Sequence, residues 1–274
     1  MFLRFKSFIL LGFLTLVSVS FAFAQENTDK PAKKEKEKKE KKNDKQSGVD
    51  LKNPNAEQVA ELAILVYGAR ENLKQIRKTT VERGKVSLVN AEGKTEQANY
   101  ERWILRADNL EKERIRFDQE FPNAKYALIY NGDKIFGLYN ESTFTPREDA
   151  SKAFENQIWR GLETLLRYKE NSSKLELAGR DKLMNVEFYL LDVTDKQNRK
   201  TRFYISTKTF RVMMLEYTEN DTKYRRRFYD YKVAQGTLVP YRTVLWANDK
   251  QIEETEIQTI TFGQKVEENM FQGS

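Results

Sequence analysis

The sequence has neither cysteine nor histidine among its 274 residues. Without cysteine the chain forms no disulfides and carries no lipidated cysteine, so its hydrophobic core alone must hold the fold. The serine, cysteine and zinc catalytic arrangements that need these residues are excluded. A glycine-rich phosphate loop is also lacking. Carboxylate pairs are the remaining enzymatic option, and we predict no catalytic residues, no metal site and no cofactor.

Long apolar runs are scarce, since the only one lies at the amino terminus. After a short basic start, the apolar run extends from Ser7 to Ala24, and Ala22–Ala24 supplies the small-x-small pattern of a signal peptidase site. We therefore predict a signal peptide over residues 1–24, with cleavage before Gln25 and export to the periplasm without a second membrane span. An uncleaved inner-membrane anchor is the alternative, because a span needs about 17–25 residues.

The excess of positive charge lies mainly in the first 52 residues. The net charge is +7, of which +2 belongs to the predicted signal peptide and +3 to residues 25–52, which leaves +2 for residues 53–274. A nucleic-acid-binding protein needs a basic stripe on the fold itself, so we predict no nucleic-acid partner. Residues 25–52 contain a Lys/Glu run and no aromatic residue. We predict a disordered tether there, with contact between its lysines and anionic lipid head groups as the alternative.

Two segments have the periodicity of amphipathic helices. Asn55 is a candidate N-cap with Gln58 three residues on, as in a capping box, and apolar residues then recur at three- and four-residue steps. Gly68 inside this pattern predicts a bend or a break. The second helix is predicted to start at the cap residue Thr145 and Pro146. We expect this helix to act as a lid, with an apolar face formed by Ala150, Phe154, Ile158, Leu162 and Leu165.

The rest of the sequence has the pattern of strands joined by short connections, which join antiparallel neighbours. The predicted strands are Lys85–Val89, Gln97–Leu105, Glu113–Glu120, Ala124–Tyr130, Ile135–Tyr139, Lys174–Ala178, Asn185–Val193, Lys200–Ser206, Phe210–Thr218, Thr222–Val233, Leu238–Trp246 and Gln251–Phe262. Several of them are apolar on both faces, whereas a sheet covered on one face should alternate. Helices, or a ligand, are therefore expected to cover one surface of the sheet.

Charged clusters give weaker functional signals. Glu253, Glu254 and Glu256 lie on one predicted strand, where Glu254 and Glu256 share a face. They form either a glycosidase-like acid pair or, as we favour, a solvated strand face. In the run Arg225-Arg226-Arg227, the middle side chain faces away from its neighbours, so the run is not one anion-binding patch.

Several stretches of the latter half share the pattern of one known family. They are Tyr130–Phe136, Leu177–Asp181, Phe188–Val193, Arg202–Ile205, Phe210–Met213, Ile257–Phe262 and Val266–Phe271. Together they resemble the outer-membrane lipoprotein carrier (LolA-like) superfamily. The resemblance implies a mainly β (α+β) fold over residues 53–274, a strongly curved antiparallel sheet or incomplete barrel whose concave side is covered by helices. It also implies a helix-locking arginine, for which Arg70 and Arg77 are both candidates.

Members of that superfamily carry the acyl chains of lipoproteins through the periplasm. We therefore predict a monomeric, non-catalytic periplasmic protein that binds the acyl chains of lipids or lipoproteins in an apolar cavity. The residues predicted to line this cavity are Ile115, Phe117, Phe154, Ile158, Phe188, Leu190, Phe203, Ile205, Met213 and Leu215. One alternative is an envelope sensor or scaffold of the same fold that binds a protein partner. The other is a hydrolase that uses carboxylates alone.

Overall fold

The computed structural model describes residues 53–273 except residues 91, 133 and 141. The predicted signal peptide (residues 1–24) and the predicted tether (residues 25–52) lie outside the described residues. In the described part, thirteen strands are accompanied by four α-helices and two short 3-10 helices, η1 Leu110–Lys112 and η2 Glu268–Phe271. None of these helices combines the length and the hydropathy that crossing a membrane requires.

All thirteen strands of the described residues form one antiparallel sheet. The strands are β1 Thr79–Val89, β2 Thr95–Leu105, β3 Arg114–Phe121, β4 Ala124–Asn131, β5 Lys134–Tyr139, β6 Ser142–Phe144, β7 Lys174–Leu183, β8 Val186–Thr194, β9 Lys200–Ser206, β10 Val212–Glu219, β11 Thr222–Ala234, β12 Thr237–Ala247 and β13 Lys250–Phe262. Their order is β6-β5-β4-β3-β2-β1-β13-β12-β11-β10-β9-β8-β7. The sheet is open, because β6 and β7 are its two edges.

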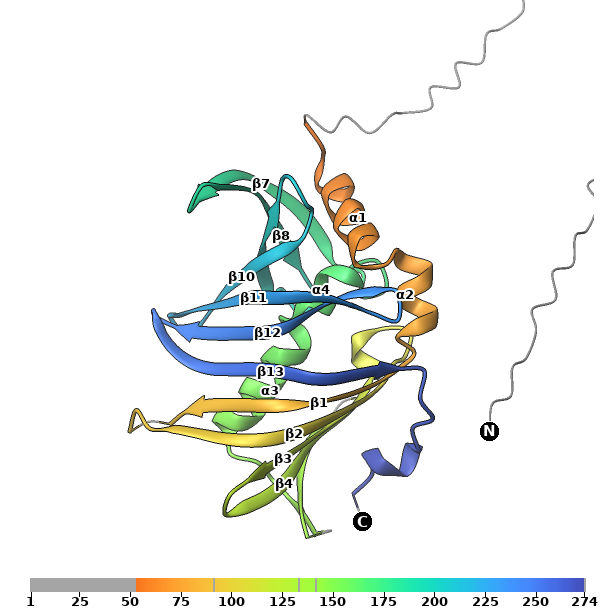
Figure 1. The fold of residues 1–274 in the computed structure, drawn as a ribbon, viewed down its shortest axis with the longest axis vertical. Helices are drawn as coiled ribbons and strands as arrows, with labels where there is room; N and C mark the ends of the chain where they lie inside the picture. Colours follow the sequence, from red (N-terminus) through yellow and green to blue (C-terminus); the bar gives the residue numbers. More distant parts are fainter. Residues whose placement is uncertain (1–52, 91, 133, 141, 274) are drawn as a thin grey trace, which may run out of the picture. The chain divides into compact units, whose positions relative to one another are not determined.

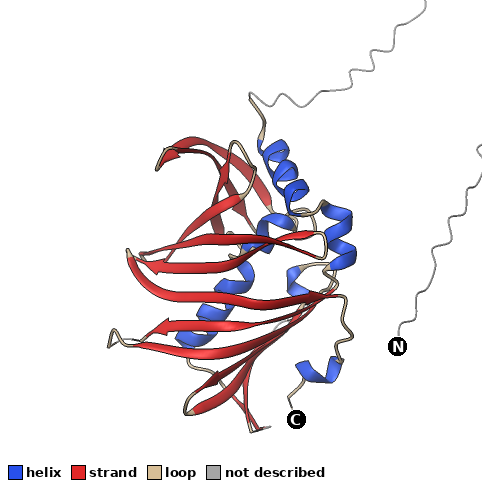
Figure 2. Ribbon diagram, in the orientation of Figure 1, coloured by secondary structure: helices blue, strands red, loops and turns tan. Residues whose placement is uncertain are grey.

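The sheet curves around two helices, α3 Glu148–Trp159 and α4 Leu162–Leu166. Figure 1 shows both helices on one face of the sheet, behind strands β11–β13, and Figure 2 separates helices from strands by colour. The predicted fold class is therefore confirmed: a mainly β, curved and incomplete barrel whose concave side is covered by helices.

Strand β1 is longer at its amino-terminal end than the sequence pattern predicted. It begins at Thr79, six residues before the predicted Lys85. The extension contains Glu82 and Arg83, whose charges interrupt the apolar alternation that marks a strand. A bulge follows at Gly84, where a Cβ atom would lie 2.0 Å from the carbonyl oxygen of Glu256. Glycine is therefore required for β1 to pair closely with β13.

The first helical segment is two helices, α1 Ala56–Tyr67 and α2 Arg70–Ile76. The predicted capping box is confirmed, since Gln58 N donates to Asn55 Oδ1 and Asn55 N donates to Gln58 Oε1, both at 2.9 Å. The predicted break is confirmed as well. Gly68 ends α1 at φ +133°, a backbone conformation that side-chain-bearing residues rarely adopt.

The second helical segment differs from its prediction at both ends. Helix α3 begins at Glu148 with Arg147 as its N-cap, so Thr145 and Pro146 precede the helix. Arg147 instead bonds to the Asp149 carboxylate within the first turn. The helix stops at Trp159, and α4 restarts after Gly161, whose Cβ position would lie 2.6 Å from a backbone oxygen of α3. The predicted single apolar face is therefore divided between two helices.

The division of the helices produces two separate hydrophobic clusters on the concave side. The α1 core, where α1 and α4 pack on β8–β12, includes Val59, Ile64, Tyr67, Leu165, Leu191, Phe203, Ile205 and Leu215. The α3 core, where α3 packs on β1–β4, includes Val86, Tyr100, Ile115, Phe117, Leu128, Phe154 and Ile158. The break between α3 and α4 lies between the helices of the two cores, so imperfect packing is expected there.

Candidate functional site

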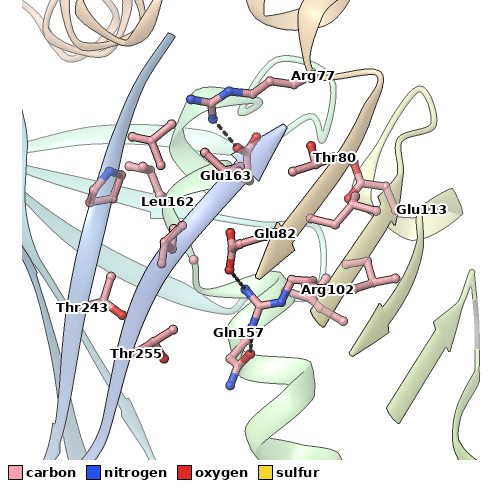
Figure 3. Close-up of a pocket in the computed structure, with 18 of the residues that line it drawn as sticks. Arg77, Thr80, Glu82, Arg102, Glu113, Gln157, Leu162, Glu163, Thr243 and Thr255 are labelled. Carbon is pink, nitrogen blue, oxygen red and sulfur yellow. Dashed lines mark hydrogen bonds and ion pairs between the residues drawn. The ribbon is translucent and has the colours of Figure 1, made fainter. Parts of the chain in front are cut away.

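A cavity of about 210 Å³ lies between helices α3 and α4 and the strands β1–β3 and β11–β13. Figure 3 shows side chains from both helices and from the sheet that face this space. Phe154, Gln157 and Ile158 reach it together from α3, because residues three and four apart share one helix face. An apolar cavity of about 150 Å³ in another protein binds benzene. This cavity therefore has room for a short stretch of an acyl chain.

Much of the cavity wall is apolar. The apolar lining residues are Ile104, Leu110, Ile115, Phe154, Ile158, Leu162, Phe228, Val239, Pro240, Ile257, Ile260 and Phe262. They come from eight different elements, so no single segment of the sequence carries the pattern of the wall. The remaining lining consists largely of charged side chains, which form two networks.

The α3 network ties helix α3 to the sheet. Arg102 Nη1 lies 3.5 Å from the Glu82 carboxylate, and Arg102 Nη2 donates to Gln157 Oε1 at 2.9 Å. Gln157 in turn donates to Glu253 Oε2 at 3.2 Å, and Arg226 donates to Glu253 Oε1 at 2.8 Å. Burial alone would raise the pKa of Glu253, but Arg226, Arg102 and Gln157 together lower it below its usual value. The network holds two arginines and two glutamates and is balanced in charge.

The α4 network lies at the other end of the cavity. Glu163 on α4 accepts from Arg77 Nη1 and from Arg106 Nη1, each at 2.9 Å. Arg106 also lies 3.5 Å from Glu113, which forms a second ion pair with Arg167. Burial would raise the pKa of Glu163, but Arg106 and Arg77 lower it. Burial and the like charge of Arg106 lower the pKa of Arg167 to about 10.

The two candidates for a helix-locking arginine occupy different positions. Arg77 is a member of the α4 network and also donates to the carbonyl oxygen of Leu238 at 2.9 Å. Arg70 does not line the cavity and binds Glu61 and Glu170, each at 2.8 Å. Of the two, therefore, only Arg77 touches the cavity.

Four of the ten residues predicted to line the cavity lie at or beside it. Ile115, Phe154 and Ile158 line the cavity directly. Phe117 is adjacent, with its ring stacked on that of Phe154 at a centroid distance of 6.2 Å. The structure thus brings together the predicted residues of β3 and α3.

The other six predicted residues lie in two other places. The first group packs in the α1 core and comprises Phe203, Ile205 and Leu215. The second group belongs to a small cluster with Tyr204 and Met214 and comprises Phe188, Leu190 and Met213. Adjacent residues of a strand point to opposite faces, so Phe203 and Tyr204 cannot line the same space. The doubly apolar strands β8–β10 thus pack on both faces instead of lining the cavity.

Sequence reasoning missed the strand residues that form the opposite wall. Phe228, Val239 and Ile257 line the cavity from β11, β12 and β13. The available signal was the alternation along β13, where Glu253, Thr255 and Ile257 share a face. A face that mixes charged and apolar residues does not stand out in a search for apolar alternation.

The acidic cluster of β13 is divided between two environments. Glu253 is buried and paired with Arg226 inside the cavity. Glu254 faces the other way and lies 3.3 Å from Arg242, and Glu256 is exposed. Arg226 likewise points into the cavity, whereas Arg225 binds Glu216 on the other face at 2.8 Å. The prediction that Arg226 faces away from its neighbours is confirmed.

The buried carboxylates predict that acid destabilises the protein. The folded-state pKa values of Glu163 and Glu253 lie below the unfolded value of 4.5. Their stabilising contribution is thus fully present above that value and is lost as the pH falls through the folded-state pKa, since the unfolded chain binds protons first. We expect the free energy of unfolding, measured with urea, to fall between about pH 5 and about pH 3. A Glu163→Gln/Glu253→Gln variant should show a flatter dependence, and an equally steep one would contradict this assignment.

Taken together, the structure is an open, curved antiparallel sheet that holds helices against its concave face around an amphipathic cavity. This is the fold of LolA superfamily proteins. One such protein from Nitrosomonas europaea superposes with a TM-score of 0.58 at 11% identity, over 80% of this chain and 98% of that chain. A DUF1329 family protein from Desulfovibrio piger gives 0.56 at 12% identity, over 80% and 98%.

A third solved structure has the same fold. It is an outer membrane lipoprotein-sorting protein domain from Vibrio parahaemolyticus, with a TM-score of 0.50 at 13% identity over 79% of this chain and 97% of that chain. No family model matches the chain, and no curated protein matches it either. The resemblance inferred from the sequence is therefore confirmed at the level of the fold.

Proposed function

We propose that this protein is a non-catalytic periplasmic protein that binds the acyl chains of lipids or lipoproteins in the cavity under α3 and α4. The observation that carries the proposal is the cavity of about 210 Å³, whose wall is largely apolar although it lies among charged networks. Each acyl methylene transferred from water to an apolar wall contributes about 0.8 kcal/mol. Three or four buried methylenes therefore contribute about 3 kcal/mol to binding without any chemical step.

The carboxylates of the cavity support a non-catalytic role. The cavity glutamates are each paired with an arginine: Glu82 with Arg102, Glu113 with Arg167, Glu163 with Arg77 and Glu253 with Arg226. A carboxylate that acts as a general acid needs a raised pKa. The pKa values of Glu163 and Glu253 are instead lowered, because the arginines outweigh burial.

The shared fold supports the choice of cargo and compartment. The Vibrio parahaemolyticus domain of the same fold is described as an outer membrane lipoprotein-sorting protein. Export through the predicted signal peptide, residues 1–24, would place this chain in the compartment where such sorting occurs. The Lys/Glu-rich residues 25–52 then act as a spacer ahead of a monomeric binding domain.

Filling the cavity with a bulky side chain tests the proposal. Ile257→Trp places an indole in the cavity, and we expect it to weaken binding of a fluorescent fatty acid by about tenfold or more. The matched control is Gln258→Trp, since the neighbouring residue is exposed on the other face of β13, and it should leave the affinity unchanged. Circular dichroism verifies that both variants fold. Absence of binding by the unmutated protein would reject the proposal.

Lipids that co-purify with the protein provide an independent test. We expect mass spectrometry of protein extracted from its native envelope to find acyl-chain-bearing molecules in the unmutated protein. The Ile257→Trp variant should carry fewer of them, because its cavity is filled. Equal amounts in both would place the bound lipid outside this cavity.

One feature favours the alternative role as a scaffold for a protein partner. Strand β7 is an edge of the sheet, and within the described residues it pairs with β8 alone. The tip of this hairpin exposes Leu183, Met184 and Val186. Unpaired edges of this kind accept a strand from another chain. Amide hydrogen exchange in the presence of envelope extract would show protection of β7 if such a partner binds there.

A further inference from the structure

One end of the cavity, the polar end, is lined by two arginines and two glutamates of the α4 network. The α4 network consists of the arginines Arg77, Arg106 and Arg167 and the glutamates Glu113 and Glu163. Arg167 does not line the cavity and also interacts electrostatically with Asp108 and Glu170, so the cavity lining is balanced in charge at both ends. The α4 end is distinguished instead by buried polar atoms that have no hydrogen-bond partner in the described part of the chain. Figure 3 shows Arg77, Glu163 and Thr80 together at that end, away from Thr243 and Thr255.

Three polar atoms at this end lack hydrogen-bond partners among the described residues: Arg77 Nε, Arg106 Nε and Thr80 Oγ1. Arg77 is only 6% exposed and Thr80 only 3% exposed, and both line the cavity. A buried donor without an acceptor is costly, more so when it carries charge. Two guanidinium N–H groups and one hydroxyl are therefore placed to receive an acceptor atom from a ligand.

The outer side of the α4 network has more basic than acidic side chains. Arg77, Arg106 and Glu163 also line a depression of about 530 Å³ beside α2. Lys74 and Lys78 are exposed on its wall. The guanidinium groups thus separate an apolar cavity from a basic surface, an arrangement that suits a molecule with an apolar tail and a negative head. Arginine binds carboxylate and phosphate groups through several N–H donors at once.

We propose that the cavity binds a single-chain amphiphile with an anionic head group, carboxylate or phosphate, held by Arg77, Arg106 and Thr80 at its polar end. The inference rests on the proposed function, because the acyl tail must occupy the apolar part of the cavity. The head group accepts hydrogen bonds from the two guanidinium Nε atoms and from the Thr80 hydroxyl. The tail then lies against Phe154, Ile158 and the strand residues opposite them.

A ligand series with one constant tail tests this inference on the unmutated protein. Hexadecanoate, hexadecyl phosphate, hexadecanol and hexadecyltrimethylammonium are each used to displace a fluorescent acyl probe. We expect at least one of the two anions to bind about tenfold or more tightly than the alcohol, and the cation to bind least tightly. The preference between the two anions distinguishes a free fatty acid from a phosphate-bearing lipid. Equal binding of all four would overturn the head-group site and leave the proposed function standing, whereas no binding at all would reject both.

A matched pair of isosteric variants localises the head group. Thr80→Val removes the unpartnered hydroxyl at the cavity. The control, Thr201→Val, removes a buried hydroxyl of β9 that lies away from the cavity and also has no partner among the described residues. Both variants are expected to fold, since neither hydroxyl makes a protein hydrogen bond. We expect Thr80→Val to reduce the preference for the anion over hexadecanol by about fivefold to tenfold and Thr201→Val to leave it unchanged. Equal preferences in the two variants would place the head group elsewhere.

Discussion

Replacing Arg226 by methionine is expected to lower the free energy of unfolding by about 3–5 kcal/mol, because it leaves a buried carboxylate without its partner. The side chains of Arg226 and Glu253 are only 14% and 8% exposed, and their ion pair measures 2.8 Å. Glu253 also receives the hydrogen bond from Gln157 that ties α3 to β13. Loss of Arg226 therefore leaves the buried charge of Glu253 without its ion-pair partner and weakens the attachment of α3 to β13. Urea unfolding near neutral pH measures the effect.

Two further variants separate this effect from loss of charge alone. Arg225→Met removes the neighbouring arginine, but its partner Glu216 keeps Lys223 at 3.2 Å and the Tyr204 hydroxyl at 2.8 Å. We expect this variant to lose about 1 kcal/mol or less. The double variant Arg226→Met/Glu253→Leu should recover most of the lost stability, since an apolar pair replaces a buried ion pair with little cost. If Arg226→Met costs no more than Arg225→Met, the pair does not hold the helix.

Truncating Phe203 to alanine is expected to cost about 3–5 kcal/mol, as for other large-to-small changes in a filled core. Phe203 is fully buried in the α1 core, between α1 and the sheet. Phe154→Ala is the informative comparison, because Phe154 is equally well shielded from water but faces the cavity. Part of its surroundings is already empty, so we expect its loss to be smaller by about 1–2 kcal/mol.

The two truncations should also differ in ligand uptake. Phe154→Ala enlarges the cavity and should change the affinity for a fluorescent fatty acid, whereas Phe203→Ala should leave it unchanged in protein that remains folded. Thermal and urea unfolding give the stabilities, and probe titration gives the affinities. A loss at Phe154 as large as that at Phe203, together with no probe binding by the unmutated protein, would mean that α3 closes a solid core. The carrier hypothesis would then be abandoned for a structural or partner-binding role.

Features of the fold that depend on neighbours in sequence could be predicted. The capping box of Asn55 and Gln58 and the break at Gly68 require only a few consecutive residues. The antiparallel order follows from short connections between strands. The start of α3 was mispredicted, because the helix begins at Glu148 with Arg147 as its N-cap and leaves Thr145 outside it. The break at Gly161 was also missed. A lone glycine in the sequence does not show that a side chain at that position would collide with the backbone of α3.

The candidate site was predictable only in part. Periodicity identified Phe154 and Ile158 as one helix face, but it could not distinguish a face over a cavity from a face over a filled core. It also could not decide which side of the doubly apolar strand β9 faces inward. The resemblance had named Arg77 as one of two candidates for a helix-locking arginine, but sequence reasoning could not pair it with Glu163, because the two residues are 86 positions apart in the chain. Each of them, read alone, is an ordinary surface charge.

The sequence by itself determined a mainly β domain with one amphipathic helical segment before its first strands in the chain and another after them. Strand and helix periodicities are local properties of the chain, so they can be read from the sequence. Only the tertiary structure decided where the cavity lies, which charges line it and that one end has buried donor atoms without a partner among the described residues. The physical reason is that a buried charged or polar group needs a partner, whereas an exposed one is solvated by water. Arg77, Arg106 and Glu163 are brought from three separate segments to the wall of one cavity. There an unpartnered donor is costly, and a matching anion is correspondingly favoured.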